Sequence, residues 1–134
     1  MPDTFDKQNE NKRQVGSDHE EKACRFLMSE GYSILKRNYR VRSGEIDIIA
    51  RDKDTLVFIE VKYRAGKRSG APEEAVGIKK QQKIAKTALF YLKYAHISPE
   101  TKIRFDVIAI VGDEIRLIKD AFPFPEMGYA DTIW

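Results

Sequence analysis

Two carboxylates and one lysine interrupt the most apolar stretches of this sequence. Asp47 lies within residues 45–50, and Glu60 and Lys62 lie within residues 55–63. Buried charge is costly unless it is paired or coordinates a metal ion, so such residues are either compensated or used in chemistry. Hydrolysis of a phosphodiester needs a divalent cation and a group that orients the attacking water. We therefore interpret Asp47, Glu60 and the Val61 carbonyl as ligands for Mg²⁺ or Mn²⁺, and Lys62 as the residue that positions the water.

The two stretches that carry these residues predict a β-hairpin. Residues 51–54 (RDKD) are short and rich in turn-forming side chains, so they join the strands as a tight loop. Residues 55–63 are apolar on both faces, which predicts a central strand that is covered on both sides. Alternation then places Glu60 and Lys62 on the same face as Leu56 and Phe58.

The remaining patterns predict an α/β fold with a mixed central sheet flanked by helices, in the order αβββαββ. The second helix follows the third strand as a crossover, so the strands before and after that helix are expected to be parallel. The other predicted elements are a helix at 17–31, a strand at 32–42, a helix at 73–96, and strands at 103–110 and 114–119.

With 134 residues the chain has room for one domain. We expect a flexible polar leader at 1–14, the domain at 15–122, a mobile loop at 65–72 and an irregular tail at 123–134. No apolar run reaches the roughly 20 residues that span a bilayer, and the leader does not resemble a secretory signal. We expect a cytoplasmic protein without a membrane partner, and a packed thiol at the lone Cys24.

Positive charge is clustered along the chain, although the net charge is only +3. Phosphate is a natural partner for such clusters, and the alternative is a set of solvated faces. The predicted nucleic-acid contacts are Arg40, Arg42, Arg64, Lys67, Arg68, Lys80 and Lys83.

Asp47 followed by Glu60-Val61-Lys62 resembles the D…(D/E)xK signature of the PD-(D/E)xK nuclease superfamily. The runs GEIDIIARDKDTLVFIEVKYR, AVGIKKQQKI and RFDVIAI resemble the YraN-like family of uncharacterised bacterial proteins, which are similar to Holliday-junction resolvases, and the agreement covers residues 16–122. The resemblance implies a restriction-endonuclease-like fold and a metal-dependent endonuclease for DNA, including branched or structured DNA. By analogy it also implies a homodimer.

The same resemblance assigns two helical residues to the site. Glu20 matches an acidic residue that serves related resolvases as an additional metal or water ligand, and Gln81 matches a residue that supports the catalytic lysine. His19 stands where the family commonly has glycine. For Glu20 the alternative role is a carboxylate favoured by the helix dipole.

Several alternatives to these roles stay open. Asp47, Glu60 and Lys62 can be a compensated ion cluster, and the chain a nucleic-acid-binding module that does not cut. Glu45 is either a ligand or the ion-pair partner of an arginine, Arg40 or Arg42. We expect Asp106 to pair with Arg104 or Lys62, and we interpret His19 and His96 as surface or helix-end residues.

Overall fold

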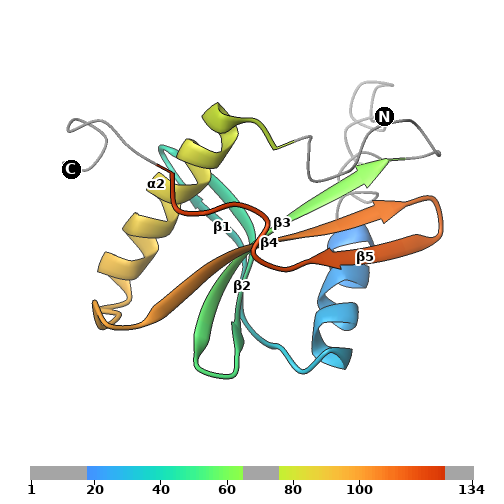
Figure 1. The fold of residues 1–134 in the computed structure, drawn as a ribbon, viewed down its shortest axis with the longest axis horizontal. Helices are drawn as coiled ribbons and strands as arrows, with labels where there is room; N and C mark the ends of the chain where they lie inside the picture. The colour runs from blue at the N-terminus through green and yellow to red at the C-terminus, as the bar shows by residue number, and fades with distance from the viewer. Residues whose placement is uncertain (1–17, 65–75, 126–134) are drawn as a thin grey trace, which may run out of the picture.

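The computed structural model describes residues 18–64 and 76–125 of the chain. A first helix covers residues 18–29, and the other elements are β1 (Ser33–Val41), β2 (Gly44–Asp52), β3 (Thr55–Arg64), α2 (Ile78–Tyr94), β4 (Lys102–Val111) and β5 (Glu114–Ile118). The strands form one sheet in the order β1-β2-β3-β4-β5 (Figure 1). Strands β3 and β4 are parallel and the other neighbours are antiparallel.

This is the mixed α/β architecture, with the element order αβββαββ, that the sequence predicts for a restriction-endonuclease-like fold. Of the predicted helix at 73–96, residues 73–75 lie outside the described residues, and within them the helix begins at Ile78, later than predicted, because Gly77 is extended (φ −71°, ψ 165°). The predicted leader, the loop at 65–72 and most of the predicted tail lie outside the described residues.

The sheet separates two apolar layers, and Figure 1 shows α2 and the first helix, drawn in blue, on opposite sides of it. On the α2 side, Ile84 and Ala88 pack against Leu56 and Phe58 of β3. On the other side the first helix packs against the alternate residues of the same strand; the cluster there includes Ala23, Cys24, Leu27, Val57 and Ile59. The predicted burial of both faces of β3 is therefore confirmed, and so is the packed thiol of Cys24.

The first helix ends at Gly31, whose φ of +93° is a conformation that glycine adopts without strain. The next amide, that of Tyr32, turns back and donates to the Leu27 carbonyl at 2.9 Å. This turn directs Tyr32 into the same apolar layer as Leu27.

A polar network closes this layer at the end of the sheet where β2 turns into β3. Arg104 Nε donates to buried Asp106 at 2.8 Å, and Arg104 Nη2 donates to Tyr32 at 2.8 Å and to Asp52 at 2.9 Å. Burial and the hydrogen bond to Asp106 raise the pKa of Tyr32. The predicted pairing of Asp106 is confirmed, with Arg104 as its partner. No helix within residues 18–64 and 76–125 is long and apolar enough to cross a membrane.

Candidate active site

The candidate site lies where the pairing of β2 with β3 ends. The strands pair from Asp52 with Thr55 up to Ile48 with Ile59, and Asp47 is the next residue of β2. There the Val61 amide donates to Asp47 Oδ2 at 2.8 Å. A side-chain carboxylate thus takes the acceptor role that a main-chain carbonyl has elsewhere in the sheet.

Asp47 and Glu60, which the sequence predicts as metal ligands, line one cavity of ≈260 Å³. Residues of β2, β3 and α2 enclose it; the full lining is Gly44, Glu45, Asp47, Glu60, Lys80, Lys83 and Ile84. The cavity therefore contains acidic groups from the two hairpin strands and ammonium groups from the crossover helix.

The Glu60 carboxylate is only 8% exposed, and two lysines compensate its charge. Lys62 Nζ lies 3.7 Å from Glu60 Oε1, and Lys80 Nζ lies 3.4 Å from the same oxygen. Glu60 and Lys62 therefore lie next to each other, as the sequence predicts. Lys80 was predicted only as a phosphate contact, but it lies as close to Glu60 as Lys62 does.

No lysine or arginine among the described residues lies within salt-bridge distance of the Asp47 carboxylate. Burial, and next the negative charge of Glu60, raise its pKa to about 8, although the Val61 amide favours the ionised form. Two carboxylates that repel each other in a partly desolvated cavity form an environment that a hard divalent cation stabilises. The donor set of Asp47 and Glu60 fits Mg²⁺ or Mn²⁺ in this respect.

Glu20 lies in the first helix with its side chain buried, on the helix face that also carries Ala23 and Leu27. Its Oε1 atom has no hydrogen-bond partner among the described residues, and Arg37 Nε lies 3.5 Å from it. Burial raises the pKa of Glu20, and Arg37 opposes this shift. Glu20 Oε1 therefore has an ion-pair partner in Arg37 but no hydrogen-bond donor in the described part of the chain.

Within the part of the chain that the structure describes, no group of three or more His, Cys, Asp or Glu side chains is arranged to hold a metal ion. Glu20 is thus not part of a three-ligand group with Asp47 and Glu60 in the described residues, and its role as a metal or water ligand stays a prediction. Its negative charge still contributes to the raised pKa of Asp47.

Two other predicted residues have defined partners. Gln81 Nε2 donates to the Val76 carbonyl at 2.9 Å, at the start of α2, and Gln81 does not line the cavity. Arg40 Nε lies 2.7 Å from Glu45 Oε2, so the predicted ion pair is confirmed with Arg40 as the partner. Glu45 also lines the cavity.

The predicted nucleic-acid contacts are spread around this site. Lys80 and Lys83 line the cavity, whereas Arg40, Arg42 and Arg64 are exposed on β1, the following turn and the end of β3. Lys67 and Arg68 lie outside the described residues. His96 is exposed just after α2, as predicted.

The sequence interpretation missed two contacts. Lys80 reaches Glu60 because the crossover from β3 to the parallel strand β4 places the start of α2 near the end of β3, and the predicted parallel pairing contained that signal. The His19 ring stacks on Tyr63 with ring centroids 3.6 Å apart. No spacing in the sequence indicates this second contact.

The fold and this cavity define an α/β protein of the restriction-endonuclease-like architecture, with a carboxylate pair and two lysines at the end of its central hairpin. The family model of Uncharacterised protein family UPF0102 matches residues 19–110. The chain belongs to this family, so the predicted membership of a family of uncharacterised bacterial proteins is confirmed.

Individual members of the family are close in sequence. A UPF0102 protein of Lachnoclostridium phytofermentans is 50% identical over 112 residues, which cover 84% of this chain and 95% of that protein. A UPF0102 protein of Syntrophus aciditrophicus is 50% identical over 107 residues, covering 77% of this chain and 84% of the relative. A UPF0102 protein of Persephonella marina is 48% identical over 107 residues, which cover 80% of this chain and 91% of that protein.

Proposed function

We propose that this protein is a metal-dependent endonuclease that hydrolyses phosphodiester bonds in DNA and belongs to the PD-(D/E)xK superfamily. The observation that carries the proposal is the shared cavity of Asp47 and Glu60, with the ammonium group of Lys62 beside Glu60. Branched or otherwise structured DNA is the first substrate class to test, because the sequence resembles Holliday-junction resolvases.

Asp47 and Glu60 would hold Mg²⁺ or Mn²⁺, with the Val61 carbonyl as the predicted third protein ligand. The cation supplies charge neutralisation for the phosphate that is attacked. The main-chain amide of Val61 fixes the Asp47 carboxylate, so that this ligand is held in place before substrate binds. Glu20 is the proposed assisting carboxylate.

Lys62 is the proposed positioning group for the attacking water. Its ammonium lies 3.7 Å from Glu60 Oε1, longer than a hydrogen bond, so its protons are available to a water molecule or a phosphate oxygen. Lys80 and Lys83 of α2 line the cavity and favour the approach of a phosphate to the two carboxylates. Water then attacks phosphorus, the bond to one sugar oxygen breaks, and that oxygen receives a proton.

Cleavage of branched, single-stranded and duplex DNA with Mg²⁺ tests the proposal. We expect Glu60→Gln and Lys62→Ala to lower the cleavage rate by about 100-fold or more, because each removes a group at the reacting phosphate. The matched controls are Asp54→Asn and Lys102→Ala, which change an exposed ion pair of 3.4 Å far from the cavity. Cleavage that survives Glu60→Gln and Lys62→Ala would exclude this site as its source.

The second candidate function is a nucleic-acid-binding module that does not cut. Its supporting observation is that Lys62 and Lys80 both lie within ion-pair distance of Glu60 and can compensate its charge. Such a module binds DNA equally well in a chelator and in Mg²⁺, and turns over no substrate. A rate that depends on Mg²⁺ and is lost in Glu60→Gln would exclude it.

A further inference from the structure

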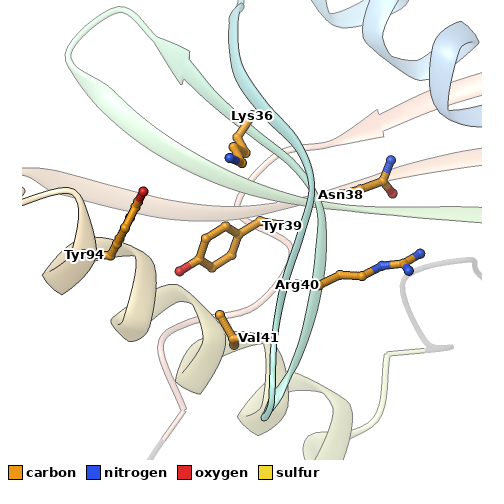
Figure 2. Close-up of a pocket in the computed structure, with 6 residues that line it drawn as sticks. All are labelled: Lys36, Asn38, Tyr39, Arg40, Val41 and Tyr94. Atoms are coloured by element: carbon orange, nitrogen blue, oxygen red, sulfur yellow. The ribbon is translucent and has the colours of Figure 1, made fainter.

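A second cavity, of ≈430 Å³, lies at the edge of the described sheet. Five residues of β1 and one of α2 line it: Lys36, Asn38, Tyr39, Arg40, Val41 and Tyr94 (Figure 2). Its volume is within the range of roughly 300–1,000 Å³ that holds small organic groups. We call it the Tyr94 pocket.

Two tyrosines give the Tyr94 pocket an aromatic character. Tyr94 is the last residue of α2, and it is 74% exposed, the largest fraction among the exposed large apolar and aromatic side chains of the described residues. Tyr39 is buried and packs edge-on against Tyr91, with ring centroids 5.3 Å apart, so its ring is fixed. Figure 2 shows Tyr39 and Val41 directed to the Tyr94 side of β1. A fixed aromatic floor with one free aromatic face suits a planar ligand.

The rim of the Tyr94 pocket is basic. Lys36 and Arg40 are exposed, and no carboxylate is among its described lining residues. Figure 2 shows Asn38 and Arg40 on the side of β1 opposite to Tyr39, whereas Lys36 lies on the Tyr39 side and borders the aromatic floor. A cationic rim beside an exposed aromatic ring is the composition of sites for single-stranded nucleic acid.

One ion pair connects the Tyr94 pocket with the candidate active site. Arg40 lines the pocket, and its partner Glu45, at 2.7 Å, lines the cavity of Asp47 and Glu60. Arg40 and Glu45 are opposite each other in the β1–β2 pairing. A nucleic-acid strand that enters the active cavity can therefore continue past Arg40 to Tyr94.

We propose that the Tyr94 pocket binds an unpaired nucleotide next to the phosphate that is cleaved, with its base stacked on Tyr94 and a phosphate on Lys36. This inference rests on the proposed nuclease function and specifies its substrate. A base inside a duplex is stacked on its neighbours and has no free face for a tyrosine, whereas a base in a gap, flap or branch point has one. The preferred substrate is therefore DNA with a single-stranded stretch beside the cleavage position.

Binding in a chelator tests the pocket independently of cleavage. The probes are a fluorescent single-stranded oligonucleotide and a duplex of the same sequence, followed by fluorescence anisotropy. We expect Tyr94→Ala to weaken single-strand binding by roughly 5-fold or more and to leave duplex binding unchanged. Tyr94→Phe keeps the aromatic face and should bind like the wild type. Circular dichroism checks that each variant is folded.

The cationic rim has its own readout. We expect Lys36→Ala to reduce the slope of log K against log salt for the single strand by about 0.7, the value for one lost phosphate contact. Lys102→Ala is the matched control, because Lys102 is an exposed lysine of β4, three strands away from β1 in the sheet, and its partner is Asp54. Its slope should equal that of the wild type.

Three results would overturn the inference: unchanged single-strand binding in Tyr94→Ala, an equal loss for duplex, or a concentration-dependent dimer that only Tyr94→Ala dissociates in sedimentation. The last would make this edge a contact between copies of the chain. Failure of the nuclease proposal looks different. If Tyr94→Ala selectively loses single-strand binding but the wild type cleaves no DNA with Mg²⁺, the nucleotide-binding role of the pocket stands and the nuclease proposal is refuted.

Discussion

Replacing Asp47 by asparagine is expected to stabilise the folded protein at alkaline pH. Burial and the charge of Glu60 raise the pKa of Asp47 from 3.8 to about 8. Between these two values the folded state binds one proton more than the unfolded state, so the free energy of unfolding falls as pH rises through that window. Asparagine has nearly the same shape, still accepts from the Val61 amide, and carries no charge.

The size of this effect follows from the pKa. A change from 3.8 to about 8 corresponds to roughly 5 to 6 kcal/mol when the carboxylate is fully ionised in a rigid site. The site is a cavity of ≈260 Å³, and water that enters it hydrates the ionised carboxylate and lowers this cost. We therefore expect Asp47→Asn to gain about 2 to 5 kcal/mol at about pH 9, and only about 1.5 kcal/mol at about pH 5, where the unfolded carboxylate is ionised but the folded one is still protonated.

Urea unfolding of the wild type and the variant in a chelator, at about pH 5 and pH 9, measures the effect. Asp106→Asn is the matched control, because Asp106 is a buried aspartate with Arg104 as its partner at 2.8 Å, whereas Asp47 is half-buried and has no such partner among the described residues. It should lose about 2 to 4 kcal/mol at both pH values, since it leaves a partly buried guanidinium with one partner fewer. An Asp47→Asn protein that is no more stable than the wild type at pH 9 would refute the assignment of Asp47 as a carboxylate with uncompensated charge.

Three further outcomes follow from the same site and fold. Mg²⁺ at ten times its dissociation constant should stabilise the wild type by about 1.4 kcal/mol at pH 9 and leave Asp47→Asn unchanged in the same urea assay; equal stabilisation would place the ion elsewhere. Lys80→Ala should change the free energy of unfolding by less than about 1 kcal/mol, because Lys80 is half exposed. The same variant should lower the slope of log K against log salt for DNA binding by about 0.7 to 1, and an unchanged slope would show that Lys80 does not contact a phosphate. Leu27→Ala should lose about 2 to 5 kcal/mol in urea unfolding, because Leu27 is fully buried between the first helix and the sheet; a loss below 1 kcal/mol would contradict that packing.

Local patterns in the sequence were sufficient to predict the sheet. Period-two alternation in β3 correctly divided Leu56 and Phe58 from Val57 and Ile59, because each face of a central strand meets a different apolar layer. The parallel pairing of β3 with β4 followed from the helix between them. The start of α2 could not be predicted in this way, because the apolar pattern continues through Val76 although Gly77 is extended.

The site could be predicted only as far as its strands. Alternation places Glu60 and Lys62 on one face, but the distance of Lys80 from Glu60 depends on how closely α2 approaches the sheet. The stacking of His19 on Tyr63 joins residues from two elements, and the Tyr94 pocket likewise joins β1 and the end of α2. Such contacts between elements have no period in the sequence, so no local pattern predicts them.

The main-chain hydrogen bond at Asp47 separates a structural requirement from a functional one. The Val61 amide needs an acceptor because the β2–β3 pairing has ended, and asparagine would supply that acceptor without charge. The chain instead carries a carboxylate whose pKa is raised to about 8 beside a second carboxylate, which costs stability at neutral and alkaline pH. A cation between the two groups removes this cost, and neither Lys62 nor Lys80 pairs with Asp47 within salt-bridge distance in the described residues. The choice of aspartate at this position therefore favours a bound metal ion over a purely structural hairpin.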